Sequence, residues 1–169
     1  MAENVSTEVL NHQQVSTRIR RMAWQIYENN STHPEIILAG IMERGHLLAS
    51  KIAEVLREIS PLKVSLHKIV LDKQNPLSSS VNLEPEAGNL DGRTITVVDD
   101  VLNSGATLIY GVRYFLQFPV REIKTAVLVD RNHKRFPVKA DFKGLSLSTS
   151  MMEHVSVNID QEPYSVRVS

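Results

Sequence analysis

Two adjacent acids stand between an apolar run and a Ser/Gly/Thr turn in the middle of the chain. Residues 94–107 read TITVVDDVLNSGAT. The near-continuous apolar half predicts a strand that is covered on both faces, as in parallel sheets. Asp99 and Asp100 then fall at its carboxyl end, where open α/β sheets bind their ligands. Carboxylates at that edge can accept hydrogen bonds from sugar hydroxyls and can share a Mg²⁺ ion with a phosphorylated ligand.

The turn after the acids has the composition of a phosphate site. It consists of Asn103, Ser104, Gly105, Ala106 and Thr107, and an apolar stretch with helical spacing follows it. Successive backbone N–H groups at the positive end of a helix dipole attract a phosphate. Gly105 lets the backbone approach such an anion closely. The acids and the turn together predict a sugar-phosphate site.

This segment resembles the signature of the type I phosphoribosyltransferases: a hydrophobic strand, two acids, two apolar residues and a Ser/Thr-Gly-x-Thr turn. The sequence VVDDVLNSGAT contains each of these parts. The resemblance implies an enzyme that transfers ribose 5-phosphate from 5-phosphoribosyl-1-pyrophosphate to a nitrogenous base. It implies that Asp99 and Asp100 hold the ribose and that residues 103–107 hold the 5′-phosphate. It also implies Mg²⁺ as the cofactor, held by the same two acids directly or indirectly.

A second segment, GIMERG at residues 40–45, is similar to the pyrophosphate loop of this family. Within the family its pattern looks closest to the bacterial bifunctional pyrimidine-operon attenuator and uracil phosphoribosyltransferase. The resemblance implies that Met42, Glu43, Arg44 and Gly45 bind pyrophosphate and that the loop contains a non-proline cis peptide bond. Arg44 suits a catalytic role because a guanidinium binds a leaving pyrophosphate through parallel hydrogen bonds.

The resemblance continues beyond the catalytic core. Residues 128–144 read LVDRNHKRFPVKADFKG and are similar to the segment that forms the attenuator family's hood over the base. By this resemblance Asp130 and Arg131 lie beside the base, and Val138 and Lys139 contact it largely with backbone groups. The similarity extends over residues 15–160 of the chain.

The chain differs from the attenuator family at residues that are expected to bind RNA. The family's basic residues are replaced by Met151 and His154, and Trp24 stands where its first helix usually has a histidine. Phosphate contacts supply much of the affinity for RNA, so these replacements weaken the expectation that the chain binds RNA. Arg18, Arg20 and Arg21 could form a local basic patch, although a solvated helix face explains them as well.

Asn103 bears on the choice of base. The 6-oxopurine phosphoribosyltransferases usually have an aspartate there that handles the purine N7 proton, and an asparagine is not a general base. We therefore expect uracil as the acceptor, giving UMP and pyrophosphate. Two alternatives remain open: a UMP-sensing, RNA-binding transcription regulator, and a phosphoribosyltransferase for another base such as a purine.

The order of elements predicts an α/β fold with a doubly wound parallel sheet flanked by helices. Helical spacing runs over residues 15–27, 47–59 and 108–118, and strand patterns cover 35–41, 63–71, 94–98 and 122–129. The polar stretch 72–92 predicts a flexible loop that closes over the ligand. Short strands at 138–142, 144–147, 155–159 and 164–168 predict a small antiparallel hood over residues 130–169.

Composition limits the remaining possibilities. A chain of 169 residues matches one domain, residues 1–169, and it contains no cysteine and 19 basic against 19 acidic side chains. The amino terminus is polar and lacks an apolar signal segment, so we expect a cytoplasmic protein without a membrane partner. The six histidines have no metal-ligand spacing. Family resemblance suggests a homodimer or a homotetramer.

Overall fold

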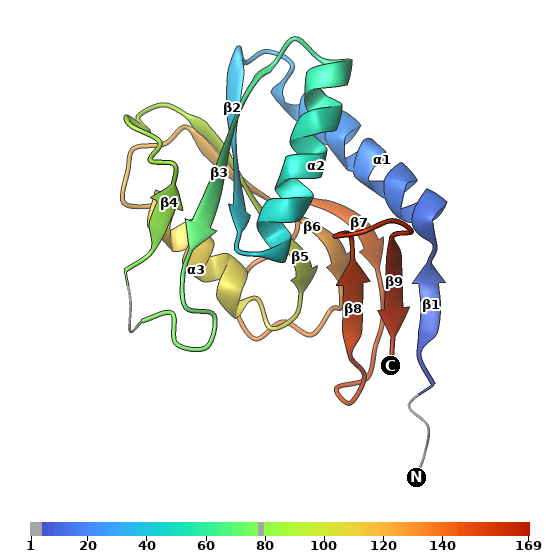
Figure 1. Ribbon diagram of the computed structural model, residues 1–169. Helices are drawn as coiled ribbons and strands as arrows, with labels where there is room; N and C mark the ends of the chain where they lie inside the picture. Colours follow the sequence, from blue (N-terminus) through green and yellow to red (C-terminus); the bar gives the residue numbers. More distant parts are fainter. Residues whose placement is uncertain (1–4, 78–79) are drawn as a thin grey trace.

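The structure is a computed structural model that describes residues 5–77 and 80–169. Its centre is a six-stranded sheet (Figure 1). In sheet order the strands are β4 (Asn82–Glu84), β3 (Lys63–Val70), β2 (Glu35–Ile41), β5 (Thr94–Leu102), β6 (Glu122–Asp130) and β7 (Phe142–Ser146). Only β4 is antiparallel to its neighbour among the described strands of this sheet. The strand that carries the two acids is therefore central and parallel to both of its neighbours.

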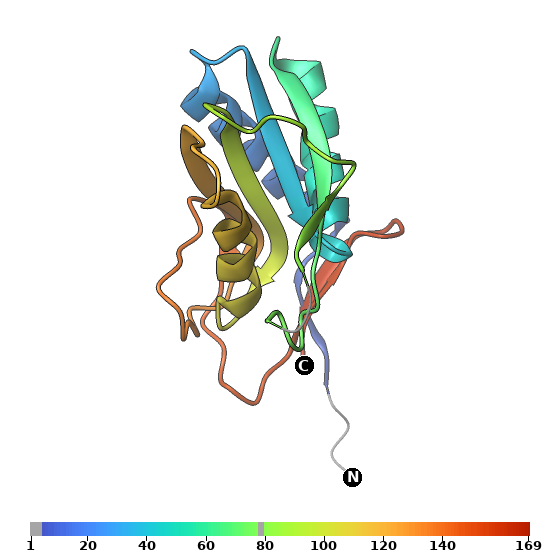
Figure 2. The ribbon, with the colours of Figure 1, turned by 90° about the vertical axis from the view of Figure 1, so that its left-hand side faces the viewer.

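Helices cover both faces of this sheet (Figures 1 and 2). On one face, α1 (His12–Asn30) and α2 (Arg44–Ile59) pack on each other and on the strands. On the other face, α3 (Ala106–Phe115) packs on β5, with Leu108 and Phe115 buried. The two apolar layers confirm the doubly wound α/β arrangement.

The first helix shows how local sequence sets an element's limits. Asn11 precedes α1 and accepts a hydrogen bond from the Gln14 backbone N–H at 2.9 Å, while the Gln14 side chain accepts one from the Asn11 N–H. This reciprocal capping box satisfies two N–H groups that a helix start leaves unpaired. The buried side chains recur at helical spacing along α1: Val15, Ile19, Met22, Ala23, Ile26 and Asn30. They fix the helix against the sheet.

A second, smaller sheet is antiparallel and confirms the expected hood element in outline. It pairs β1 (Thr7–Leu10) with β9 (Ser165–Val168), and β9 with β8 (Val155–Asn158). Strand β1 was not expected from the sequence, and it joins the beginning of the described chain to its end. The sheet lies beside β5, since β8 contacts that strand.

Two expectations for the hood segment are wrong. Residues 138–141 form no strand, and the strand that begins at Phe142 is β7, which extends the central sheet parallel to β6. A parallel partner is possible because residues 131–141 run back from the carboxyl end of β6, so that Phe142 begins β7 beside Ala126. Loop 72–92 contains the short strand β4, and residues 78–79 of that loop lie outside the described residues. None of the helices in the described part of the chain has the length and apolar character needed to cross a membrane.

Candidate functional site

Asp99 and Asp100 lie on the last part of β5, which continues beyond them to Leu102. Asp99 is buried, and its Oδ1 accepts a hydrogen bond of 2.9 Å from the Asp100 backbone N–H. Asp100 is half-buried. Both line one cavity of about 150 Å³ together with residues 101–108, as the sequence predicted for the acids and the turn.

Lys73 is a residue of this cavity that sequence reasoning missed. It comes from loop 72–92, and its Nζ lies 3.9 Å from Asp99 Oδ1. A lysine in a long polar loop has no motif to mark it. Only its charge, opposite to that of the two acids, could have suggested the contact.

The pKa of Asp99 is raised from 3.8 to about 8. Burial is the largest cause, because it disfavours the charged form, and the neighbouring Asp100 carboxylate adds to the rise. The Lys73 ammonium acts in the opposite direction and lowers this pKa. A cationic ligand at the cavity would likewise favour the carboxylate form of Asp99.

The loop at residues 42–45 joins β2 to α2 and lies directly against β5. Its Met42–Glu43 peptide bond is cis, as the resemblance implied. A Cβ added at Gly45 would lie 2.6 Å from the Val98 carbonyl oxygen and 2.9 Å from the Asp99 Cα. Only a glycine lets the start of α2 approach the acids this closely. The structure thus brings the predicted pyrophosphate loop to the predicted ribose site.

Arg44 is held by the small antiparallel sheet. Its Nη1 donates a hydrogen bond to the Val157 carbonyl oxygen and lies 3.6 Å from Asp160 Oδ1. Arg44 and Glu43 line a second cavity of about 470 Å³ with His46, Leu47, Ser50 and Asp160. The Glu43 carboxylate forms an ion pair of 3.7 Å with Lys68 on β3. The Arg44 side chain is half exposed in this arrangement, so it remains accessible to an anion.

The phosphate turn has the conformation that its residues suggest. Gly105 adopts φ +87°, and an added Cβ would lie 2.6 Å from Val138 Cγ1. The Ser104 hydroxyl accepts a hydrogen bond of 3.2 Å from the Ala106 N–H. Helix α3 begins at Ala106, so the remaining N–H groups of its first turn have no partner within the helix. They are available to a phosphate in the cavity.

Arg131 connects the phosphate turn to the hood. Its Nη1 donates a hydrogen bond of 2.9 Å to Asn103 Oδ1, and its Nε donates one of 3.0 Å to the Thr149 hydroxyl. Its Nη2 donates to the carbonyl oxygens of Ser150 at 3.2 Å and Glu153 at 2.6 Å. All three guanidinium nitrogens therefore donate to protein oxygens.

The other residues expected near the base, Asp130, Val138 and Lys139, differ from one another in burial and in contacts. Asp130 is buried, accepts a hydrogen bond from the Asn132 N–H at 2.9 Å, and lies 3.7 Å from the Lys143 Nζ. Val138 packs on Gly105, beside the phosphate turn. The Lys139 side chain is 80 % exposed and lies 3.8 Å from Asp141, outside the cavity lining.

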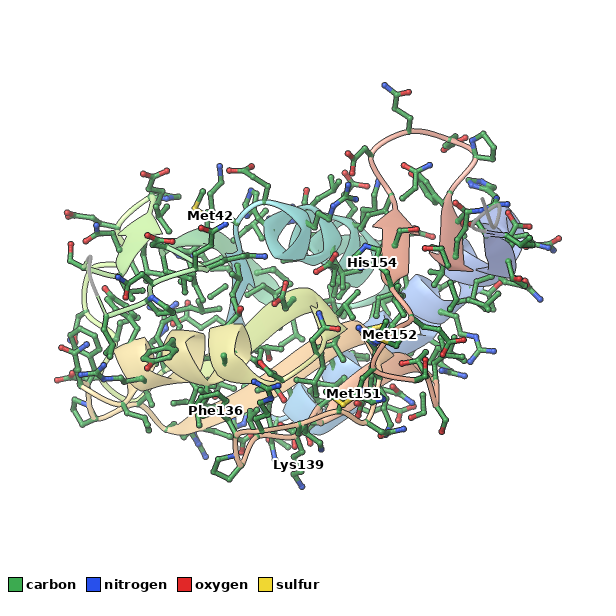
Figure 3. All side chains as sticks on the ribbon, turned by 90° about the horizontal axis from the view of Figure 1, so that it is seen from below. Met42, Phe136, Lys139, Met151, Met152 and His154 are labelled. Carbon is green, nitrogen blue, oxygen red and sulfur yellow. The ribbon has the colours of Figure 1, made fainter. Side chains whose placement is uncertain are left out.

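Figure 3 shows the arrangement of these loops from below. Met42 lies on one side of the β5 and α3 ribbons, and Phe136 and Lys139 lie on the other. Met151, Met152 and His154 lie on the chain that leads into β8. The 42–45 loop contacts the acids through Gly45 and Asp99, and the 136–139 segment contacts the phosphate turn through Val138 and Gly105.

The site fits a magnesium ion that is shared with its ligand. Among the described residues no group of three or more His, Cys, Asp or Glu side chains could hold a metal ion by itself. Asp99 and Asp100 offer the oxygen donors that Mg²⁺ prefers, and the phosphate oxygens of a ligand would complete its coordination.

Comparisons with known proteins agree with this geometry. Residues 5–162 match the family model described as phosphoribosyl transferase domain. The bifunctional protein PyrR of Clostridium acetobutylicum is 30% identical over 163 residues, covering 92% of each chain. That of Streptococcus mutans is 32% identical over 155 residues, covering 90% of this chain and 88% of its own.

Solved structures share the fold at lower sequence identity. The hypoxanthine phosphoribosyltransferase of Trypanosoma cruzi superimposes with a TM-score of 0.76 at 16% identity, covering 96% of this chain and 95% of its own. A hypoxanthine-guanine phosphoribosyltransferase of Bacillus anthracis gives a TM-score of 0.69 at 17% identity, covering 85% and 83%. The chain therefore belongs to the type I phosphoribosyltransferase family, among the relatives of the bifunctional protein PyrR.

Proposed function

We propose that the protein transfers the ribose 5-phosphate group of 5-phosphoribosyl-1-pyrophosphate to uracil, giving UMP and pyrophosphate. The observation that carries this proposal is the cavity in which Asp99, Asp100 and the turn 103–107 come together. A pair of carboxylates beside a phosphate cradle matches a ribose that carries a 5′-phosphate. The likeness to PyrR and the asparagine at position 103 support uracil as the base.

The two acids act on the ribose. Asp99 and Asp100 accept hydrogen bonds from the ribose hydroxyls and stabilise the positive charge that develops at C1 as pyrophosphate leaves. Residues 103–107 hold the 5′-phosphate through backbone N–H groups and hydroxyls, which fixes the sugar relative to the acids. Asp99 and Asp100 are the residues that would hold Mg²⁺, which would supply charge stabilisation for the leaving pyrophosphate.

The loop 42–45 binds the pyrophosphate. The close contact of Gly45 with Asp99 supports a pyrophosphate site next to the proposed ribose site. Arg44 donates its remaining N–H groups to the pyrophosphate, whose charge grows during the reaction. Loop 72–92 closes over the donor to exclude water, and Lys73 adds a positive charge next to Asp99.

The base lies between the hood and the phosphate turn. The Val138 carbonyl and the Lys139 N–H form no hydrogen bond within residues 5–77 and 80–169, which leaves both groups available for a base edge. The Lys139 carbonyl is engaged by the Thr125 hydroxyl, so it is not such a group. Asp130, which is buried, and Arg131, which is half-buried, border the base position.

A second candidate function is that of a UMP-sensing RNA-binding regulator, which the similarity to bifunctional PyrR supports. The contacts of the arginines on α1 argue against RNA binding. Arg18 and Arg21 each donate a hydrogen bond of 2.8 Å to the Gly144 carbonyl, and Arg20 pairs with Glu58 at 3.3 Å. Each of these arginines thus has a protein partner, while Arg20 and Arg21 remain exposed on the helix face.

The remaining attributes follow from the proposed reaction and from family resemblance. We place the protein in pyrimidine salvage in the cytoplasm, as a homodimer or a homotetramer.

The proposal is tested with a panel of bases. Purified protein is incubated with 5-phosphoribosyl-1-pyrophosphate, Mg²⁺ and one of uracil, cytosine, hypoxanthine, guanine or adenine, and pyrophosphate release is followed. Release that requires uracil supports the proposal. Release with a purine and none with uracil would show that the enzyme acts on purines instead.

A further inference from the structure

We propose that Arg131 sets the base preference by orienting Asn103 so that the site presents an N–H donor to the base. Arg131 is in this view a positioning residue and not a base contact. The inference rests on the proposed function, and it concerns the chemical class of base that the same site accepts.

The hydrogen bonds of Arg131 fix its own position first. Its guanidinium donates hydrogen bonds to the Thr149 hydroxyl and to the carbonyl oxygens of Ser150 and Glu153, at distances between 2.6 and 3.2 Å. Its backbone N–H donates a further bond of 3.1 Å to the Leu102 carbonyl at the end of β5. A planar guanidinium with this many partners has one orientation.

That orientation decides which atom of Asn103 faces Arg131. An arginine has only donors, so the amide atom at 2.9 Å from its Nη1 must be the carbonyl oxygen. Asn103 lines the cavity that holds the acids and the phosphate turn. Within the described part of the chain its Nδ2 has no hydrogen-bond partner, so this NH₂ group is the part of the amide left for a ligand.

A fixed N–H donor selects bases by their hydrogen-bonding pattern. A pyrimidine-2,4-dione presents ring carbonyl oxygens, which accept such a bond. A 6-oxopurine with its proton on N7 would place N–H against N–H, and the unpaired donors would weaken its binding. The site therefore fits a base that offers an acceptor to Asn103 and that needs no proton removed at that position.

Arg131→Lys tests the role of the guanidinium, because a lysine keeps the charge and loses the planar fork. We expect the KM for uracil to rise ~10-fold, the worth of one good hydrogen bond, while the KM for 5-phosphoribosyl-1-pyrophosphate changes less than ~2-fold. Arg121→Lys is the matched control: Arg121 precedes the amino end of β6, and its exposed side chain has no partner among the described residues. We expect it to behave as wild type.

A double-mutant cycle separates positioning from direct contact. If Arg131 acts through Asn103, then Asn103→Ala alone and the Arg131→Lys/Asn103→Ala pair raise the KM for uracil equally. Independent, multiplying effects would mean that Arg131 touches the base, which overturns the inference. Asn103→Asp replaces the donor by an acceptor at constant shape, and we expect it to lower kcat/KM for uracil and to raise that for hypoxanthine.

Failure of the inference is distinguishable from failure of the proposed function. An active wild type whose KM for uracil is unchanged in Arg131→Lys and Asn103→Ala overturns the inference alone. A wild type that releases no pyrophosphate with any base overturns the proposed function and the inference with it.

Discussion

Gly45 and Asp99 lie in direct contact: a Cβ at Gly45 would be 3.1 Å from Asp99 Oδ1 and 2.9 Å from its Cα. This contact joins two segments that are far apart in the sequence. It means that the loop between β2 and α2 and the acids of β5 are held at one position by backbone packing. A pyrophosphate site built on that loop is consequently adjacent to the ribose site.

Gly45→Ala tests this relationship. The added methyl group has no room, because the nearest atoms belong to the Val98 and Asp99 backbone, so the loop must move away from the acids. We expect ~10²-fold lower kcat/KM for 5-phosphoribosyl-1-pyrophosphate, the usual effect of misplacing reacting groups by about 1 Å. Gly92→Ala is the control, because a Cβ there meets no atom within 4 Å and a hydrogen bond of 2.9 Å from the Gly92 N–H to the Pro119 carbonyl fixes this last residue of loop 72–92. It should reduce stability slightly and leave kcat/KM unchanged, and equal effects of the two variants would contradict the account.

Asp99→Asn and Asp100→Asn test the role of the acids. An amide has the shape of the carboxylate but not its charge, so the developing positive charge at the ribose loses its stabilisation. We expect turnover to fall ~10²–10³-fold in each variant with the fold intact. Steady-state kinetics and circular dichroism are the measurements. Near-native turnover in both variants would exclude the acids from the mechanism.

The raised pKa of Asp99 predicts a pH-dependent stability. The unfolded chain releases this proton near pH 4, whereas the folded protein keeps it until about pH 8, so folding takes up a proton between these values. The contribution of Asp99 to stability therefore declines as the pH rises through this window. The Asp99→Asn variant lacks this decline in stability. A decline of even ~1 kcal/mol in the wild type would give the variant a Tm about 2–4 °C above that of the wild type. Thermal melts of the ligand-free proteins should show this difference at pH 8 and little of it at pH 4.

We expect the Lys73→Met variant to have a shifted pH profile of kcat/KM. Because the Lys73 ammonium lowers the pKa of Asp99, its removal should raise that pKa further. The rise of kcat/KM with pH should then move to higher pH than in wild type. Lys63→Met, at the opposite end of β3, is the control and should leave the profile in place. An unchanged profile in Lys73→Met would show that the loop contact has no influence on Asp99.

The contacts of the α1 arginines predict weak RNA binding. Arg18 and Arg21 donate hydrogen bonds to the Gly144 carbonyl, and Met151 and His154 stand where the attenuator family has basic residues. We expect binding to a pyrimidine-leader RNA hairpin to be weak and to vanish at moderate salt, because few phosphates are neutralised. Filter binding with and without UMP measures this. Tight, UMP-enhanced, sequence-selective binding would instead favour the regulator.

The sequence predicted the parts of the fold whose signals are local. Strand β2 was expected over residues 35–41 and has these limits, because its apolar run ends at the polar loop 42–45. The acids and the phosphate turn were recognisable because strand, carboxylates and glycine turn are contiguous. The backbone geometry of such a short motif is determined mainly by its own residues.

The parts that were missed depend on contacts between distant residues. Strand β1 pairs with β9 at the other end of the chain, and its four residues have no distinctive pattern. Strand β7 has only five residues, and its packing beside β6 decides that it is parallel and belongs to the central sheet. The Lys73–Asp99 contact and the Arg131 hydrogen bonds likewise depend on how loops fold back over the sheet.

Product analysis with uracil tests the central claim most directly. Labelled uracil, 5-phosphoribosyl-1-pyrophosphate and Mg²⁺ are incubated with wild type and with Asp99→Asn, and the products are separated by chromatography. The account predicts UMP and pyrophosphate in equal amounts from wild type and a strongly reduced yield from the variant. No UMP from wild type, or equal yields from both proteins, would contradict it.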